Sequence, residues 1–147
     1  MIEVSTIGFT SKSAERFFGL LRQEKVETLL DVRLNNTSQL SGFAKKADLK
    51  FFLSELVGAR YVELHDLAPE GEMLKRYMKK ELSWDSYAKA YIELLAKRRV
   101  ESNLDIEQFN RGCLLCSEDK PHHCHRRLAV EYLNERWGNK LKIKHLF

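Results

Sequence analysis

The stretch Val26-Glu-Thr-Leu-Leu-Asp-Val-Arg33 decides the fold class of this 147-residue chain. Its centre, around Leu29 and Leu30, is typical of a strand that is buried on both faces of a parallel sheet. The charged pair Asp31 and Arg33 ends this strand, and the polar residues up to Gly42 predict a loop. A parallel strand needs helical connections, so we expect helices and strands to alternate on either side of it.

The flanking segments follow that pattern. Upstream, Ile2–Ile7 predicts a strand that ends at Gly8, and a helical stripe from Ala14 to Leu21 follows with Ser11 or Ser13 as its cap. The downstream predictions are a helix over 49–58, a strand over 61–64, an irregular segment over 65–76, helices over 84–98 and 104–109, a strand over 113–117, a helix from Pro121 to Gly138 and a closing strand over 141–147.

Strands separated by helices imply right-handed crossover units. We therefore predict one α/β domain over residues 1–147, with a mainly parallel sheet of about five strands flanked by helices. Lysines alternate along the closing strand, at positions 140, 142 and 144. Such lysines suit an edge strand that is protected against pairing with another chain.

Composition excludes several protein classes. Hydrophobic residues make up 44% and charged residues 31% of the chain, as in an ordinary globular protein and unlike a disordered one. No apolar run approaches the ~18 residues of a membrane span, and the first residues lack the pattern of a signal peptide. We expect a cytoplasmic protein with no membrane partner. Its three cysteines, an odd number, are then expected to be free thiols.

Polar residues cluster after three of the predicted strands. They are Thr6 and Gly8 after the first, Asp31, Arg33 and Ser38 after the second, and Cys116, Glu118, Cys124, His125 and Arg126 after the strand over 113–117. The carboxyl ends of parallel strands share one edge of a sheet, and ligands bind at that edge. We therefore expect these residues to surround one pocket.

Half of this set is predicted to bind a ligand. The ligand-binding residues are Thr6, Gly8, Arg33, Ser38 and Arg126. The two arginines and the start of the last helix favour an anion, so we expect a small molecule with a phosphate or carboxylate, such as a nucleotide. The formal charge of +4 is mild and is compatible with such a partner.

The other half has residue types that can carry chemistry. These candidate catalytic residues are Asp31, Cys116, Glu118, Cys124 and His125. Carboxylates and imidazoles serve as acids, bases or orienting groups, and a thiol near a helix N-terminus is a candidate nucleophile. The sequence leaves open whether the pocket catalyses a reaction or only binds a ligand. We expect no cofactor, and the oligomeric state cannot be predicted from the sequence.

Each of these features also has a structural interpretation. Asp31 and Arg33 can hold loop backbone, a cysteine is often a small buried hydrophobe, and His125 lies on the apolar face of its helix. In a fully structural reading, a buried ion pair ties the last loop to the loop at Asp31. The convergence of three strand ends nevertheless favours a pocket.

Cys113 and Cys116 have the spacing of a zinc knuckle, with Cys124 and a histidine as further candidate ligands. Both cysteines fall in a predicted strand, where residues three apart face opposite ways. A knuckle needs a turn between its cysteines, and Leu114-Leu115 is a poor turn. We therefore predict no metal site.

Residues 73–99 offer an alternative function, that of a non-catalytic nucleic-acid-binding module. Basic residues here outnumber acidic ones eight to three, and aromatic residues lie between them, as nucleic-acid surfaces require. The basic residues are Lys75, Arg76, Lys79, Lys80, Lys89, Lys97, Arg98 and Arg99. The aromatic residues have helical spacing, however, which is more typical of a core face, and the lysines are more typical of a solvated face.

The order of the motifs resembles the DUF488 family of domains of unknown function. The motifs are Thr6-Ile7-Gly8, Asp31-Val32-Arg33, Ser38 with Phe43, Tyr61, Cys116-Ser-Glu118 and Cys124-His125-Arg126. The last two are the specific part, since rhodanese-like domains also have Asp-Val-Arg at a strand end. The resemblance implies an α/β domain of this length with its motifs facing one pocket, and it implies no reaction. Family members often have a histidine where this chain has Phe9.

Overall fold

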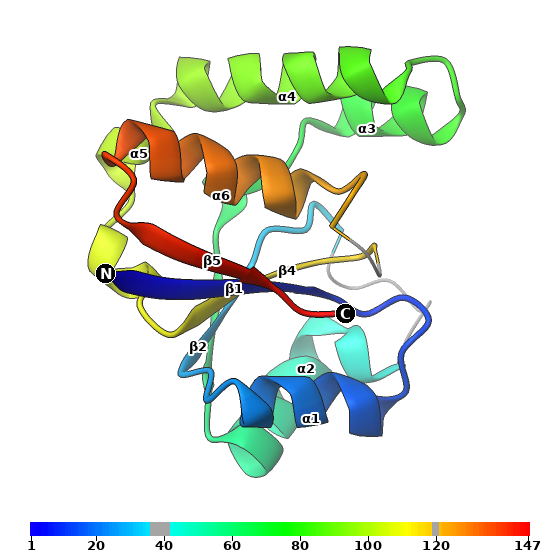
Figure 1. Ribbon diagram of the computed structural model, residues 1–147. Coiled ribbons are helices and arrows are strands. Elements are labelled where there is room, and N and C mark those ends of the chain that lie inside the picture. The colour runs from blue at the N-terminus through cyan, green and yellow to red at the C-terminus, as the bar shows by residue number, and fades with distance from the viewer. Residues whose placement is uncertain (36–41, 119–120) are drawn as a thin grey trace.

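A parallel sheet of five strands forms the centre of the computed structural model, which describes residues 1–35, 42–118 and 121–147 (Figure 1). The strands are β1 (Ile2–Gly8), β2 (Thr28–Asp31), β3 (Arg60–Glu63), β4 (Gly112–Cys116) and β5 (Leu141–His145). They lie in the order β3-β2-β4-β1-β5, and every neighbouring pair is parallel. The predicted α/β class and the predicted parallel sheet are both confirmed.

Burial explains the sequences of the strands. Every residue of β2 and β4 is buried, which accounts for their nearly continuous apolar runs. In β5, which lies at the edge of the sheet, Lys142 and Lys144 are exposed and alternate with less exposed residues. The predicted role of the last segment as a lysine-bearing edge strand is therefore confirmed.

Helices cover both faces of the sheet (Figure 1). They are α1 (Ala14–Gln23), α2 (Lys46–Phe52), α3 (Gly71–Met78), α4 (Trp84–Arg98), α5 (Val100–Asn103) and α6 (His125–Arg136), with the short turns η1 (Gly42–Ala44), η2 (Leu53–Val57), η3 (His65–Leu67) and η4 (Ile106–Phe109). The helices α1 and α2 lie on one face, and α3 to α6 lie on the other. Leu29 of β2 packs on the first side and Leu30 on the second, as the alternation of a strand requires. No helix in the described part of the chain is long and apolar enough to cross a membrane.

Local signals in the sequence set several helix ends. Ser13 caps α1, where its hydroxyl accepts a hydrogen bond of 3.1 Å from the N–H of Arg16. Gly58 ends the helical turn η2 in the left-handed conformation, with a φ of 75°. Ser83 caps α4, which has the bounds predicted for it. These helix ends can be predicted from the sequence because each depends on one residue and its immediate neighbours.

Two predictions about helices were wrong. The segment 65–76 that was predicted to be irregular contains most of the helix α3, because Pro69 lies before this helix and Gly71 is its first residue, so neither interrupts it. The last helix begins at His125 rather than at Pro121, because Cys124 has extended backbone and serves as the N-cap. Both differences bear on the site, since α3 and Cys124 lie beside it.

The strands β1 and β4 are neighbours, yet the helices that follow them, α1 and α6, lie on opposite faces of the sheet (Figure 1). The chains that leave the two strands are still in contact at the carboxyl edge, where the N–H of Thr10 donates to the carbonyl of Ser117 over 3.0 Å. Open α/β sheets bind ligands at such a position.

Candidate functional site

A cavity of about 250 Å³ lies at this carboxyl edge. Its wall contains five of the predicted site residues, namely Arg33, Cys116, Glu118, Cys124 and His125. Asp31 lies behind Arg33, and Thr6, Gly8 and Arg126 lie behind the cysteines, as the contacts below describe. Ser38 falls outside the described residues.

Asp31 and Arg33 form a buried ion pair within one loop. Arg33 donates from Nε to Oδ1 and from Nη2 to Oδ2 of Asp31, each over 2.9 Å. The hydroxyl of Tyr61 on β3 also donates to Oδ2, and burial together with Asp31 raises the pKa of Tyr61. The guanidinium of Arg33 lies 5.5 Å from the centre of the Phe9 ring. The acidic and basic groups predicted at the end of β2 thus bind each other and position Arg33 against the cavity.

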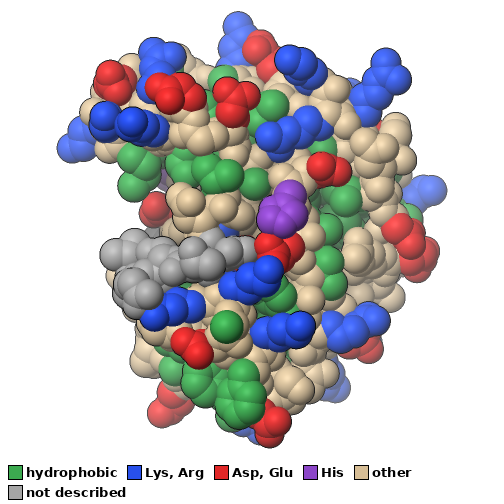
Figure 2. Space-filling view, turned by 180° about the vertical axis from the view of Figure 1, so that it is seen from behind, with side chains coloured by type: hydrophobic (Ala, Val, Ile, Leu, Met, Phe, Trp, Pro, Cys, Tyr) green, Lys and Arg blue, Asp and Glu red, His purple; other side chains and the backbone are tan. Residues whose placement is uncertain are grey.

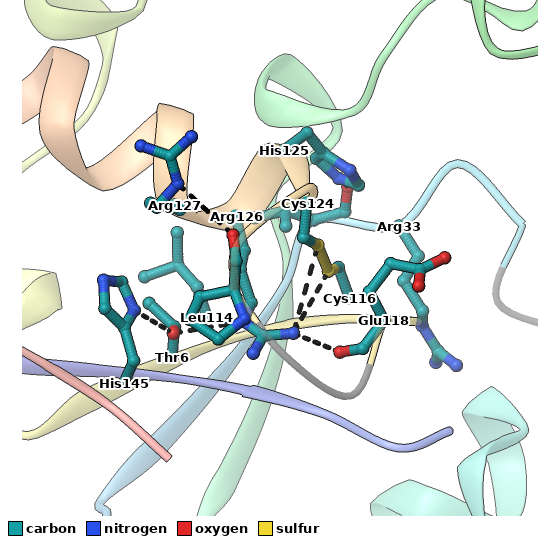
Figure 3. The surroundings of a disulfide bond; sticks show 12 residues. Thr6, Arg33, Leu114, Cys116, Glu118, Cys124, His125, Arg126, Arg127 and His145 are labelled. Carbon is teal, nitrogen blue, oxygen red and sulfur yellow. Dashed lines mark hydrogen bonds between the residues drawn. A yellow bond between two sulfur atoms is a disulfide. The ribbon is translucent and has the colours of Figure 1, made fainter. Parts of the chain in front are cut away.

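Arg126 is completely buried and reaches several loops from α6 (Figure 3). Its Nε donates to the hydroxyl of Thr6 over 3.1 Å, and its Nη1 donates to the backbone carbonyl of Glu118. The same Nη1 lies 3.6 Å from Sγ of Cys116 and 3.9 Å from Sγ of Cys124. Thr6 in turn contacts Nδ1 of His145 at 2.6 Å. Arg126 therefore links β1, the end of β4 and β5 from behind the cavity.

Gly8 is needed for space rather than for backbone conformation. A Cβ at this position would collide with the carbonyl oxygen of Glu118 and would lie 2.6 Å from Nη1 of Arg126. Its predicted role was to let backbone approach a ligand. In the structure, what approaches Gly8 closely is the loop after β4, held by Arg126.

The expectation that all cysteines are free thiols holds for Cys113 and is wrong for the other two. The structure joins Cys116 and Cys124 in a disulfide (Figure 3). The end of β4 and the N-cap of α6 meet at one edge of the sheet, so their side chains come together although eight residues separate them. Cys113 and Cys116 belong to the cores on opposite faces, which confirms the orientation expected of a strand and excludes the knuckle arrangement for this pair.

His125 is held in place as a neutral group. Its Nε2 lies 2.9 Å from the backbone carbonyl of Val32, and its ring meets Tyr91 edge to face at 5.5 Å. Burial lowers its pKa to about 4. One ring nitrogen and the sulfurs of Cys116 and Cys124 lie within 4.8 Å of one another, a set that could hold a metal ion once the sulfurs are reduced. Joined to each other, these sulfurs are not available as thiolate ligands.

An aromatic wall on α3 and α4 completes the cavity, and the sequence analysis did not assign it to the site. Tyr77 stacks on Tyr87 with ring centres 4.7 Å apart, and Trp84 stacks on His123 at 4.8 Å. All four residues line the cavity. The interleaving of aromatic residues in segment 73–99 was the signal that could have located this wall.

The basic residues of segment 73–99 occupy a different surface. All of them except Arg98 are exposed, on or next to α3 and α4. Figure 2 shows that Lys and Arg side chains are interspersed with Asp and Glu on one face of the molecule. Arg98 is the exception, since its Nη1 donates to the backbone carbonyls of Asp66 and Ala68. The aromatic residues Tyr77, Trp84 and Tyr87 face the cavity instead of accompanying the exposed lysines. Nucleic-acid binding by this segment stays a prediction.

Comparison with known proteins gives one match. The family model of the domain of unknown function DUF488 matches residues 13–133 of the chain. This range contains β2, β3, β4 and most of the cavity wall. No curated protein and no solved structure matches the chain.

Proposed function

Since the chain belongs to the DUF488 family, whose function is unknown, we propose from its site that it binds a small ligand with a planar ring and a phosphate or carboxylate, such as a mononucleotide. The observation that carries this proposal is the cavity at the carboxyl edge, which is lined by aromatic side chains of α3 and α4 and by residues at the start of α6. A pocket of this construction, apolar with a few polar groups, is typical of small-molecule sites.

The aromatic wall supports binding of a ring. The partly exposed rings of Tyr77 and Trp84 line the cavity, and the buried rings of Tyr87 and Phe9 also contribute to its wall. Aromatic side chains favour planar partners through offset stacking and edge-to-face contacts. Glu118 adds a carboxylate, which accepts hydrogen bonds from donors such as the amino groups of a nucleobase.

The start of α6 supports binding of an anion. The helix α6 has twelve residues and begins at His125, so its N-terminus directs partial positive charge toward the cavity wall. Arg126 adds a full positive charge directly behind this wall. Arg33 contributes less net charge because it is paired with Asp31.

The volume of the cavity limits the ligand. About 250 Å³ is below the range of roughly 300–1,000 Å³ that is usual for drug-sized ligands. A mononucleotide or a similar compound is therefore a better candidate than a dinucleotide. We name no reaction, because binding is what the shape and charge of the cavity support.

Isothermal titration calorimetry with adenosine monophosphate, adenosine and inorganic phosphate tests the proposal. Leu34 lines the cavity and is 39% exposed, so Leu34→Asp introduces a negative charge there without disturbing the core. Leu56 is 45% exposed outside the cavity, which makes Leu56→Asp the matched control. We expect adenosine monophosphate to bind more tightly than either of its parts.

The charge at position 34 should lower the affinity for adenosine monophosphate about tenfold. This corresponds to roughly 1.4 kcal/mol of repulsion between two partly solvated charges. Leu34→Asp should lower the affinity for adenosine less, and Leu56→Asp should change neither affinity. Equal binding of adenosine monophosphate by the wild type and Leu34→Asp would place the ligand elsewhere. Absence of binding by the mononucleotides of all four bases would reject the proposed ligand class.

A further inference from the structure

We propose that Cys116 and Cys124 are a redox-active pair that exchanges its disulfide with small thiol compounds entering the cavity. Both cysteines belong to the cavity wall, and the structure joins them. Thiol–disulfide exchange takes place in the same cavity as the proposed nucleotide binding. It goes beyond that function because it does not require the nucleotide.

The position of Arg126 is the first support. Its Nη1 lies 3.6 Å from Sγ of Cys116 and 3.9 Å from Sγ of Cys124, inside a completely buried environment. A disulfide sulfur is neutral and gains little from a cation, whereas a thiolate released by exchange gains much. The hydroxyl of Thr6 and the carbonyl of Glu118 hold the guanidinium in this place.

The start of α6 is the second support. Cys124 is the N-cap of this twelve-residue helix, so the partial positive charge of the helix also favours a thiolate there. Two independent sources of positive potential thus meet at one pair of sulfurs.

Cys113 shows the contrast within the same chain. It lies on the opposite face of β4, is fully buried and lines no part of the cavity. Burial raises the pKa of its thiol to about 12, so it is protonated and unreactive at neutral pH. Cys116 and Cys124 are also buried, so Cys113 serves as a control for position beside the cavity and Arg126 rather than for exposure.

The reaction consists of two exchanges, each of which forms one S–S bond and breaks another. A thiolate RS⁻ attacks Sγ of Cys124, the bond between the two cysteine sulfurs breaks, and Cys116 leaves as a thiolate beside Arg126. A second RS⁻ attacks the sulfur of R in the mixed disulfide, which releases Cys124 as a thiolate and forms RSSR. Two small thiols are oxidised, one protein disulfide is reduced, and the two protons of the thiols end on the protein cysteines or in solvent.

Equilibration of the full chain with mixtures of reduced and oxidised glutathione tests the proposal, with trapping by alkylation and mass spectrometry. We expect the pair to pass reversibly between disulfide and dithiol within the range of these mixtures, equally in the wild type and in Cys113→Ser. Cys116→Ser removes the resolving thiol, so it should form a stable mixed disulfide with glutathione at Cys124. A pair that stays oxidised in excess reduced glutathione, or stays reduced in excess oxidised glutathione, would overturn the proposal.

The rate of alkylation supplies the second measurement. In reduced Cys113→Ser, we expect the pH dependence of reaction with iodoacetamide to have its midpoint below about 8.5, the pKa of an ordinary cysteine. A midpoint at or above that value, or protection of both cysteines by stoichiometric bound zinc, would contradict the assignment. Nucleotide binding by the double variant Cys116→Ser and Cys124→Ser is measured in parallel, so that failure of exchange and failure of ligand binding are told apart.

Discussion

Arg33 donates two parallel hydrogen bonds to Asp31, from Nε to Oδ1 and from Nη2 to Oδ2, each 2.9 Å long. The partners are two residues apart in the sequence, and both are buried. The backbone N–H of Arg33 also donates to Oδ1 over 3.0 Å. The pair therefore fixes the turn that leaves β2 and sets the position of one cavity wall.

Removing the acid of this pair should be costly. Asp31→Ala leaves the buried guanidinium of Arg33 without its carboxylate, and we expect a loss of about 3–5 kcal/mol in the free energy of unfolding. Urea denaturation measures this loss. Glu24→Ala, which removes the exposed partner of Lys144, is the control and should cost about 1 kcal/mol or less. A loss below about 1 kcal/mol for Asp31→Ala would show that the ion pair does not hold this loop.

Replacement of glycine by alanine should lower the stability of the protein at Gly8 and raise it at Gly19. Gly8→Ala forces a Cβ against Glu118 and Arg126, so we expect a loss of at least about 1–3 kcal/mol. Gly19 lies on the exposed side of α1 with no atom within 4 Å of a built Cβ. Gly19→Ala should therefore stabilise the protein by about 0.5–1 kcal/mol. Thermal unfolding of both variants checks the pair, and a neutral Gly8→Ala would contradict the close packing behind the cavity.

Acid should weaken the fold through His125. Burial lowers the pKa of His125 from 6.5 to about 4, so the unfolded chain takes up its proton first as the pH falls. Stability is then present above pH 6.5 and is lost between about pH 6.5 and pH 4, by up to about 3 kcal/mol.

The variant His125→Gln isolates this effect. Its amide can still donate to the carbonyl of Val32, but it does not titrate, so its stability should vary less between pH 7 and pH 4.5 than that of the wild type. Burial also lowers the pKa of His145, which adds a dependence of the same sign. His145→Gln is measured for comparison. Identical pH profiles for wild type and His125→Gln would show that His125 is not held neutral.

The lysines of β5 should protect the edge of the sheet. Lys142 and Lys144 are exposed on this edge strand, and replacing both with valine leaves a flat, uncharged edge. We expect concentration-dependent association of the double variant in size-exclusion chromatography with light scattering. A matched double variant at exposed lysines of α3 and its C-cap, Lys75→Val with Lys79→Val, should leave the mass unchanged. Equal behaviour of the two variants would show that charge on β5 has no protective role.

The fold was predictable from the sequence because its signals are local or periodic. The buried strand around Leu29 has continuous apolar residues, the helix after Ser13 has a cap and a stripe, and Gly58 marks a helix end. Each of these signals depends on a few neighbouring residues. Helix α3 was missed because its first residue is Gly71, and because the helix has only eight residues, too few for a clear apolar stripe.

The site was predictable only in part, because its chemistry depends on tertiary contacts. Cys116 and Glu118 could be placed near one edge from the topology of parallel strands. That Cys116 meets Cys124 depends on the path of the intervening turn, which sequence spacing does not specify. Arg126 has the same sequence signature whether it faces a ligand or, as here, bonds Thr6 from a buried position. The aromatic stripe that begins at Trp84 was assigned to a core face because stripes that pack in a core and stripes that line a cavity have the same helical spacing.

Trp84 offers the most direct measurement of the central claim, that the cavity binds a small ligand with a ring and an anionic group. The chain has two tryptophans, and Trp137 packs against Phe109 away from the cavity, so Trp137→Phe leaves Trp84 as the single reporter. We predict that adenosine monophosphate changes the fluorescence of this variant saturably, with the dissociation constant found by calorimetry, and that inorganic phosphate alone does so only weakly. Fluorescence that is unchanged at concentrations where calorimetry shows saturation would contradict the account, because the ligand would then bind outside the cavity.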